Sequence, residues 1–270
     1  MVRAPTLAQA TLQSPFPIDY TEAGAGEVVL LIHGSLCDYR YWRWQIPQLG
    51  ESYRVAAASL RGCWPRAGTH PDPGYGIATH AEDMIALARA LGEGRPVHVL
   101  GHSRGAQVAV ELALRAPEYC KTLTLADPGF RFAHEAPTPV FYTPAVALLE
   151  KGEVDAAAEQ FIDTVNGAGT WRKMVGWFKQ MVRDNAATLL SQVLEANRPV
   201  HLEEIRRIQC PVLLLGGSDS PARYGTRQDQ LQAALPHARR EVIRLAAHGM
   251  NLANPRAFNR ACLAFFGATG

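Results

Sequence analysis

The chain has 270 residues, of which 47% are hydrophobic and 19% charged, and its formal net charge is +2. Such a composition is typical of an ordered globular protein with enough apolar side chains to bury a core, and it excludes a disordered chain. The sequence has neither a dense run of Lys and Arg nor an apolar stretch long enough to cross a bilayer, so it predicts no nucleic-acid partner and no membrane partner.

Strands and helices are predicted to alternate along the first half of the chain. Residues 7–20 are weakly patterned and are expected to supply one or two edge strands. The continuous apolar run Val28-Val29-Leu30-Leu31-Ile32 is typical of a strand buried on both faces of a parallel sheet. The spacing of apolar, Gly and Pro residues then predicts a helix over 40–49 that Pro47 closes, a strand over 53–60 and a helix over 78–91. A strand from 97, a helix after 104 and a strand over 123–126 follow.

The pattern changes after residue 127. Residues 130–205 contain no convincing strand and show helical periodicities around 145–149, 154–165, 171–182 and 186–196. Alternation resumes with strands over 211–215 and 242–245 and helices over 228–235 and 255–266. The simplest organisation is an α/β core of residues 1–128 and 206–270, with residues 129–205 inserted as a helical cap. Such an insertion emerges at the carboxyl ends of the strands, where α/β sheets bind ligands.

The remaining compositional signals concern location and partners. The five cysteines are scattered, with no pair at C-x-x-C spacing, which favours neither a disulfide framework nor a metal site. Residues 1–14 lack the charged start and apolar run of a signal peptide, so we expect a cytoplasmic protein. We expect a small-molecule substrate and no cofactor, and the sequence leaves a homodimer open.

One motif joins a predicted strand to a predicted helix. Gly101-His102-Ser103-Arg104-Gly105 has the G-x-S-x-G pattern of a nucleophile elbow. A serine at the tip of such a turn has a strained backbone and close neighbours, so glycine is the residue tolerated on either side. The motif predicts Ser103 as an exposed nucleophile. The alternative, an ordinary helix N-cap, explains the serine but not the two glycines.

A serine nucleophile needs a base, and the base needs a carboxylate to orient it. His248 lies in a Gly-flanked loop after the last predicted strand and is the best candidate for the base. Asp219 and Asp127 both follow predicted strands and compete for the role of the carboxylate. We favour Asp219, because the preceding glycines let its loop turn toward the histidine. Asp127-Pro128-Gly129, by contrast, is typical of a turn that enters the cap.

The order of these motifs resembles that of the α/β-hydrolase superfamily, in its serine-nucleophile branch with a helical cap. In this resemblance His33-Gly34 corresponds to the oxyanion loop, Gly216-Gly217-Ser218-Asp219 to the acid loop and His248-Gly249 to the histidine loop. It implies that the backbone N–H groups of Ser35 and Arg104 form the oxyanion hole. Relatives usually carry Arg-Gly-x-Gly where this chain has Arg61-Gly62-Cys63-Trp64, which puts the path of that loop in question.

Other side chains are expected to shape the pocket. His33 is expected to hold the oxyanion loop by hydrogen bonds, and the Arg104 side chain to pack under the cap, with a substrate carboxylate as its alternative partner. An apolar acyl or aryl pocket is expected among the aromatic residues, and the candidates are Trp42, Phe130, Phe132, Phe141, Tyr142, Trp171, Trp177 and Phe178.

The predicted function is a serine hydrolase that cleaves a small, largely apolar carboxylic ester or lactone through an acyl-enzyme on Ser103. Three alternatives remain: a carbon–carbon bond hydrolase of aromatic catabolism, a cofactor-free dioxygenase in which His248 deprotonates an aromatic substrate, and a receptor with slow turnover. Serine in place of aspartate at the elbow disfavours haloalkane dehalogenases and epoxide hydrolases, which form an alkyl-enzyme ester on a carboxylate.

Overall fold

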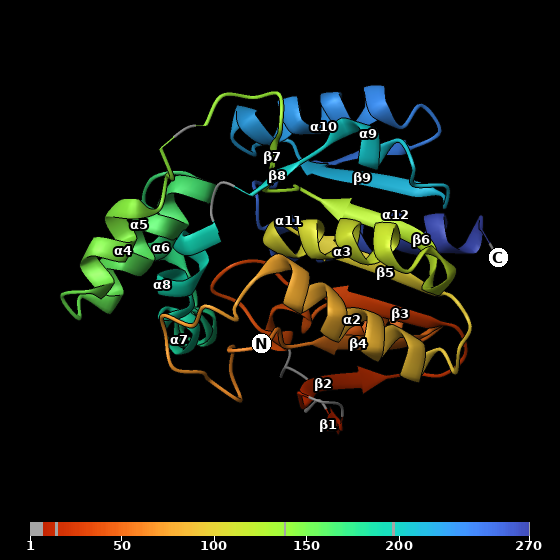
Figure 1. The fold of residues 1–270 in the computed structure, drawn as a ribbon, viewed down its shortest axis with the longest axis horizontal. Helices are drawn as coiled ribbons and strands as arrows, with labels where there is room; N and C mark the ends of the chain where they lie inside the picture. Colours follow the sequence, from red (N-terminus) through yellow and green to blue (C-terminus); the bar gives the residue numbers. More distant parts are fainter. Residues whose placement is uncertain (1–7, 14–15, 138, 196–197, 270) are drawn as a thin grey trace.

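An eight-stranded sheet forms the centre of the computed structural model, which describes residues 8–13, 16–137, 139–195 and 198–269 (Figure 1). The strands are β1 (Ala8–Leu12), β2 (Ile18–Ala23), β3 (Val28–Ile32), β4 (Arg54–Ala58), β5 (Val97–His102), β6 (Cys120–Ala126), β9 (Val212–Gly217) and β10 (Arg239–Ile243). Their order is β1-β2-β4-β3-β5-β6-β9-β10. All neighbours pair in parallel except β1 with β2 and β2 with β4. The predicted α/β class with a mostly parallel sheet is confirmed.

Helices cover both faces of this sheet. One face carries α2 (Ile77–Leu91), α3 (Arg104–Arg115) and α10 (Ala222–Ala234), and the other carries α1 (Ile46–Leu49) and α12 (Pro255–Gly267). The short elements η1 (Tyr39–Trp42), η2 (Pro117–Tyr119), α9 (Leu202–Ile205) and α11 (Met250–Ala253) lie in the connections. Within the described ranges, no helix is long and apolar enough to cross a membrane.

The apolar run of β3 explains how one strand serves two cores. All five of its residues are buried. Leu30 and Ile32 pack into the core with α2 and α3, whereas Val29 and Leu31 pack into the core with α12. Successive side chains of a strand point to opposite faces, so a strand covered on both sides needs an unbroken apolar sequence.

The chain leaves the sheet after β6 and returns to it at β9. Between them lie α4 (Thr143–Leu149), α5 (Val154–Asn166), α6 (Thr170–Lys173), α7 (Gly176–Asn185), α8 (Thr188–Gln192) and the turn η3 (Val193–Glu195). Figure 1 shows α4 to α8 gathered at the end of the sheet toward which β6 and β9 point. This segment, predicted to hold no strand, also contains β7 (Arg131–Phe132) and β8 (Pro199–Val200), which pair in parallel. Strands of two residues are too short for a periodicity to reveal them.

The helix predicted over 40–49, with Pro47 closing it, is wrong, because Pro47 lies near the start of a helix and not at its end. The chain forms the 3₁₀ turn η1 and then the separate helix α1, which has Pro47 in its first turn. Proline is tolerated in a first turn but removes a hydrogen bond inside a helix. The aromatic residues Tyr41 and Trp42 of the turn are buried all the same.

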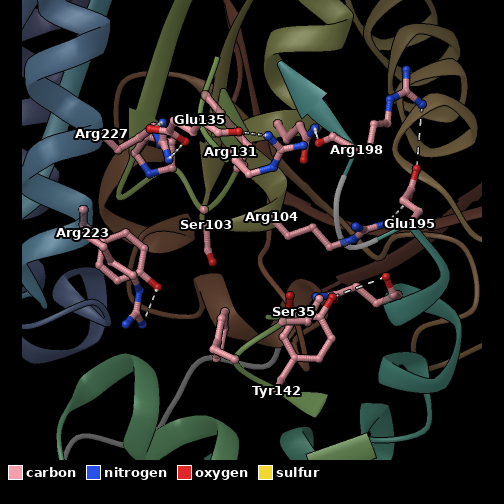
Figure 2. Close-up of a pocket in the computed structure, with 18 of the residues that line it drawn as sticks. Ser35, Ser103, Arg104, Arg131, Glu135, Tyr142, Glu195, Arg198, Arg223 and Arg227 are labelled. Atoms are coloured by element: carbon pink, nitrogen blue, oxygen red, sulfur yellow. Dashed lines mark hydrogen bonds and ion pairs between the residues drawn. The ribbon is translucent and has the colours of Figure 1, made fainter. Parts of the chain in front are cut away.

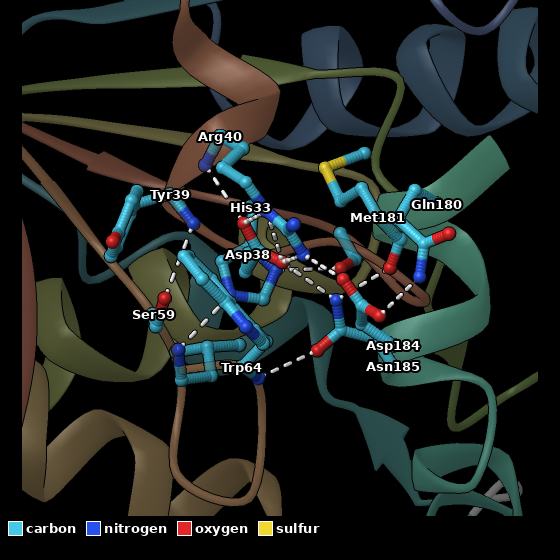
Figure 3. Close-up of polar contacts among 12 residues, drawn as sticks. His33, Asp38, Tyr39, Arg40, Ser59, Trp64, Gln180, Met181, Asp184 and Asn185 are labelled. Atoms are coloured by element: carbon cyan, nitrogen blue, oxygen red, sulfur yellow. Dashed lines mark hydrogen bonds and ion pairs between the residues drawn. The ribbon is translucent and has the colours of Figure 1, made fainter. Parts of the chain in front are cut away.

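A buried polar cluster fastens α7 to the loops that follow β3 and β4 (Figure 3). The fully buried Asp38 accepts hydrogen bonds from the Arg40 guanidinium and the Asn185 amide, each at 2.7 Å. Asn185 in turn accepts from the Trp64 backbone N–H at 2.8 Å, and Arg40 also pairs with Asp184 at 2.8 Å. The Arg40 guanidinium lies 3.9 Å from the centroid of the Trp64 ring. The bulky residue that departs from the family pattern therefore helps to hold the inserted helices in place.

Candidate active site

Ser103 stands in a strained turn between β5 and α3. Its φ is 55° and its ψ is −119°, a positive φ that residues with side chains rarely adopt. A Cβ added at Gly101 would lie 2.3 Å from the Gly105 carbonyl oxygen, and one added at Gly105 would lie 2.3 Å from the His33 carbonyl oxygen. Both separations are shorter than atoms can pack. The two glycines of the motif are therefore required by the close approach of β3, β5 and α3.

Asp127, and not Asp219, lies beside His248. The His248 Nδ1 atom is 3.3 Å from Asp127 Oδ2, and both side chains are buried. The Asp219 side chain is exposed and is bonded to the hydroxyl of Ser218 at 3.0 Å. The expectation that Asp219 orients the histidine is therefore wrong.

The order of the strands explains this correction. β6 is the direct neighbour of β5, so Asp127, just after β6, lies next to the elbow that follows β5. Asp219 lies two residues beyond the end of β9, which is one strand further from the elbow. Its backbone N–H donates to the Ala246 carbonyl at 2.9 Å, so this residue supports the histidine loop through its main chain.

Neighbouring side chains stabilise the buried carboxylate of Asp127. Ser220 donates to it at 2.6 Å and the Gln228 amide donates at 3.2 Å. Burial raises the pKa of Asp127 above its ordinary value, and these two hydrogen bonds oppose that shift. Neither Ser220 nor Gln228 stands in a recognisable motif, so the sequence alone gives no sign of either role.

The imidazole of His248 is held in one orientation. Its Nδ1 faces Asp127, and its ring stacks on Tyr224, with centroids 4.2 Å apart and planes at 16°. The Tyr224 hydroxyl is 3.5 Å from the other ring nitrogen, Nε2. Burial, and secondly the charge of Arg223, lowers the pKa of His248 below its ordinary value. A lowered pKa favours the neutral ring that a general base requires.

His33 makes the hydrogen bonds expected of it in the loop after β3, which corresponds to the oxyanion loop. Its Nε2 accepts a hydrogen bond from the Leu60 N–H at 3.0 Å, so Nδ1 carries the proton and donates to the Gly34 carbonyl at 2.8 Å. Burial lowers the pKa of His33 to about 4. Among the described residues, the backbone N–H groups of Ser35 and Arg104 have no hydrogen-bond acceptor, and these two groups are the ones expected to bind an oxyanion.

Two cavities meet at Ser103, and Ser35 and Phe161 also line both. The first, which we name the arginine-lined cavity, has a volume of about 330 Å³. Its charged lining residues are Arg104, Arg131, Glu135, Glu195, Arg198, Arg223 and Arg227 (Figure 2). The second, the apolar cavity, has a volume of about 500 Å³ and is lined largely by Ile162, Val165, Met174, Trp177, Phe178 and Leu252, with His248 and the exposed Lys173 also in its wall.

Five of the eight aromatic residues predicted to line a pocket do line one of the two cavities. Phe130, Phe141 and Tyr142 line the arginine-lined cavity, and Trp177 and Phe178 line the apolar cavity.

The other three, Trp42, Phe132 and Trp171, line neither cavity, and their prediction as pocket residues is wrong. Trp42 and Phe132 are fully buried in the two cores, and Trp171 is 5% exposed. The arginines apart from Arg104 were not anticipated, because they come from segments far apart in the sequence.

The Ser103 hydroxyl and the His248 ring line the same apolar cavity without a hydrogen bond between them in the described structure. Catalytic hydrogen bonds are often long in ligand-free enzymes and tighten when substrate binds. His102 braces the histidine loop, because its Nε2 lies 2.9 Å from the His248 carbonyl oxygen. In the described ranges, no three His, Cys, Asp or Glu side chains form a group that could hold a metal ion.

The parallel sheet and the serine elbow define a hydrolase of the α/β fold. The chain belongs to the alpha/beta hydrolase family, whose model matches residues 29–261. It is 26% identical over 267 residues to a protein of Enterobacter cloacae subsp. cloacae named "Putative carbamate hydrolase RutD", with 91% of each chain covered.

Two solved structures share the fold. Carboxylesterase CesB from Bacillus subtilis aligns with a TM-score of 0.79 and 21% identity, over 97% of this chain and 92% of that chain. A hydrolase from Pseudomonas aeruginosa aligns with a TM-score of 0.73 and 25% identity, over 96% and 98% of the two chains.

Proposed function

We propose that this protein is a serine hydrolase that cleaves a carboxylic ester or lactone through an acyl-enzyme on Ser103. The observation that carries this proposal is the contact of 3.3 Å between His248 and the buried Asp127, beside a serine held at φ 55° in the wall of two cavities. In this proposal Ser103 is the nucleophile, His248 the base and Asp127 the orienting acid.

The reaction proceeds in two steps. Ser103 Oγ bonds to the carbonyl carbon and gives its proton to His248 Nε2, while Asp127 holds the Nδ1–H and stabilises the charged ring. The bond from the carbonyl carbon to the alcohol oxygen then breaks, and His248 protonates the departing alcohol. A water molecule attacks the acyl-enzyme in the same way and releases the acid and free Ser103.

The negative charge of each tetrahedral intermediate needs donors that are already in place. The Ser35 and Arg104 N–H groups fill this role in the proposal, and the latter also begins α3, whose N-terminus favours negative charge. Loss of one such donor costs about 2.7–4 kcal/mol of activation free energy in a studied protease.

Hydrolysis of a carbamate is the second candidate, because the RutD relative is named for it. A carbamate carbonyl could be attacked by the same serine. The two cavities, of about 330 and 500 Å³, fall within the range of sites that enclose drug-sized ligands, and a carbamate ion would leave most of that space empty. The size of the cavities therefore favours a larger ester.

Kinetics with p-nitrophenyl butyrate test the proposal. We expect Ser103→Ala to lower kcat by at least about 10³-fold, and Ser52→Ala, which changes an exposed serine outside both cavities, to leave kcat unchanged. The rate should be the same in air and under argon. A Ser103→Ala variant with more than a few per cent of the wild-type kcat would contradict the proposal, and a need for oxygen would favour the dioxygenase alternative.

A further inference from the structure

The two cavities at Ser103 differ in charge, since the apolar cavity has a single charged side chain among its lining residues, the exposed Lys173. Five arginines and two glutamates line the arginine-lined cavity, which leaves a surplus of three positive charges. Figure 2 shows Arg104, Arg131 and Arg223 around the Ser103 side chain. The apolar cavity opens on the same serine. A substrate that fills both cavities would therefore carry an anionic group on one side of its scissile carbonyl and an apolar group on the other.

The two glutamates are engaged by three of the arginines. Glu135 accepts a hydrogen bond from each Nη of Arg227 at 2.8 Å. Although burial opposes the shift, the hydrogen bonds to Glu135 lower its pKa to about 2. Glu195 accepts from Arg104 at 3.0 Å and lies 3.8 Å from Arg198. These three arginines therefore already have carboxylate partners from the protein. The fourth, Arg131, donates to the backbone carbonyls of Phe132 and Glu135.

Arg223 is different. In the described part of the chain, its guanidinium donates to the Thr164 carbonyl at 3.1 Å and the Tyr224 hydroxyl at 3.4 Å, with no carboxylate partner. It lies over the rings of Phe141 and Tyr224, 5.1 and 4.8 Å from their centroids. An arginine keeps its charge at any accessible pH and matches the two oxygens of a carboxylate. Arg223, which is exposed in this cavity wall, is therefore well placed to bind one.

The position of His248 decides which part of the substrate occupies each cavity. His248 lines the apolar cavity and does not line the arginine-lined cavity. The departing alcohol must receive its proton from this histidine, so the alcohol belongs in the apolar cavity. The acyl group stays attached to Ser103 and extends into the arginine-lined cavity.

We propose that the substrate is a half-ester of a dicarboxylic acid, whose free carboxylate binds Arg223 and whose alcohol part is apolar. The inference rests on the proposed ester hydrolysis and names the substrate class for it. Attack by Ser103 forms the bond to the acyl carbon, breaks the bond to the alcohol oxygen and passes the serine proton through His248 to the alcohol. Water then releases the dicarboxylate.

Three benzyl esters test this orientation. Benzyl butyrate is uncharged, monobenzyl glutarate carries a carboxylate on the acyl side, and 4-carboxybenzyl butyrate carries one on the alcohol side. We expect kcat/KM for monobenzyl glutarate to exceed that for benzyl butyrate by at least about tenfold, and 4-carboxybenzyl butyrate to be the poorest. The preference for the glutarate should weaken as salt is added, because salt screens an exposed charge.

Variants assign the preference to one residue. Arg223→Gln should lower the ratio of kcat/KM for monobenzyl glutarate over benzyl butyrate by about tenfold. Arg256→Gln, on an exposed arginine of α12 that lines neither cavity, should leave the ratio unchanged.

Binding is measured separately by calorimetry on the Ser103→Ala protein. We expect monobenzyl glutarate to bind more tightly than benzyl methyl glutarate, in which the charge is masked, and Arg223→Gln to abolish that difference.

The outcomes separate the two proposals. Hydrolysis of all three esters with no preference for monobenzyl glutarate would overturn the inference and leave the proposed function standing, and a preference for 4-carboxybenzyl butyrate would reverse the orientation and overturn it too. If neither p-nitrophenyl butyrate nor any of the three esters is hydrolysed, the proposed function fails and the substrate class fails with it, and the calorimetry then decides only whether Arg223 binds a free carboxylate. Equal binding of the charged and masked glutarates would overturn it.

Discussion

At the scale of single residues, the site depends on the carboxylate of Asp127, whose burial disfavours the charged form. Asp127 is fully buried, and Ser220, Gln228 and His248 lie within 2.6, 3.2 and 3.3 Å of its oxygens. None of these partners is a permanent cation. Hydrogen bonds therefore stabilise the charge, and the same carboxylate fixes the orientation of the imidazole.

Replacement of the two competing aspartates tests this assignment. Asp127→Asn should lower kcat by at least about 10²-fold, because an amide favours the wrong tautomer of the histidine. Asp219→Asn should change kcat by less than about twofold, since the Asp219 side chain is exposed and outside both cavities. Kinetics with p-nitrophenyl butyrate measure both effects, with circular dichroism to verify folding. A larger loss in Asp219→Asn would contradict the account.

The pH dependence follows from the burial of His248. A general base acts in its neutral form, so kcat/KM is high above the pKa of His248 and falls as the pH drops through it. Burial and Arg223 lower that pKa. We therefore expect kcat/KM to begin its fall on the acid side of the pH profile (the acid limb) only below about pH 6.5, the ordinary histidine pKa.

The Arg223→Gln variant provides an internal check on this profile. It removes one cause of the lowered pKa, so the acid limb should move toward neutral pH by less than about one unit, because the exposed charge is partly screened. Arg256→Gln should leave the profile in place. A limb at or above neutral pH in the wild-type protein would show that burial does not control the base.

The sequence located the elbow but could not decide the acid. The two glycines around Ser103 are set by sterics within a few residues, so the motif carries the geometry with it. The choice between Asp219 and Asp127 depends on which strand lies beside β5, and spacing along the chain contains no information on that order. The roles of Ser103, His248, Ser35 and Arg104 remain predictions for the experiments above.

At the scale of elements, the position of α7 determines the shape of the apolar cavity, because Trp177 and Phe178 of this helix line it. The cluster around Asp38 links α7 to the core through Asn185 and Arg40. Loss of the Asp38 carboxylate would leave the half-buried Arg40 guanidinium with Asp184 as its single carboxylate partner. Removing a partner from a buried charge lowers the stability of the folded protein.

Two substitutions, one in a buried ion pair and one in an exposed ion pair, test whether the cluster around Asp38 holds α7 on the core. Asp38→Ala should lower the free energy of unfolding by about 3 kcal/mol, since it removes the buried partner of Arg40. Asp155→Ala removes the exposed partner of Arg183, which also lies on α7. It should lower the free energy of unfolding by less than about 1 kcal/mol. Urea unfolding followed by circular dichroism measures both. Equal losses would mean that the buried cluster does not hold the helix.

Elements with a continuous pattern were predictable, and those shaped by local constraints were not. The branched-apolar run gave β3 with its observed bounds, Val28–Ile32. The helix predicted over 40–49, with Pro47 closing it, is wrong because Pro47 lies in the first turn of a new helix, α1, and the residues before it form the 3₁₀ turn η1. The two-residue strands β7 and β8 have no periodicity of their own and form only because the chain leaves and re-enters the core at adjacent points.

At the scale of the whole molecule, the site is a junction between the sheet and the inserted helices. The turns after β5 and β6 supply Ser103 and Asp127, and the loop after β10 supplies His248. The insertion supplies much of both cavity walls. The family and fold could be predicted because four motifs follow strands in a fixed order. The cavities could not, because their shape and charge depend on how α4 to α8 pack and on arginines from separate segments.

The central claim is that Ser103 carries the acyl group during turnover. Intact-mass and peptide-mass spectrometry, after the Asp127→Asn protein is mixed with p-nitrophenyl butyrate and quenched in acid, measures this directly. We predict a butyryl group on the peptide that contains Ser103, and no such group when Ser103→Ala is added. A butyryl group on another residue would contradict the account. So would release of p-nitrophenol by the wild-type protein if no acylated Ser103 were found at any quench time.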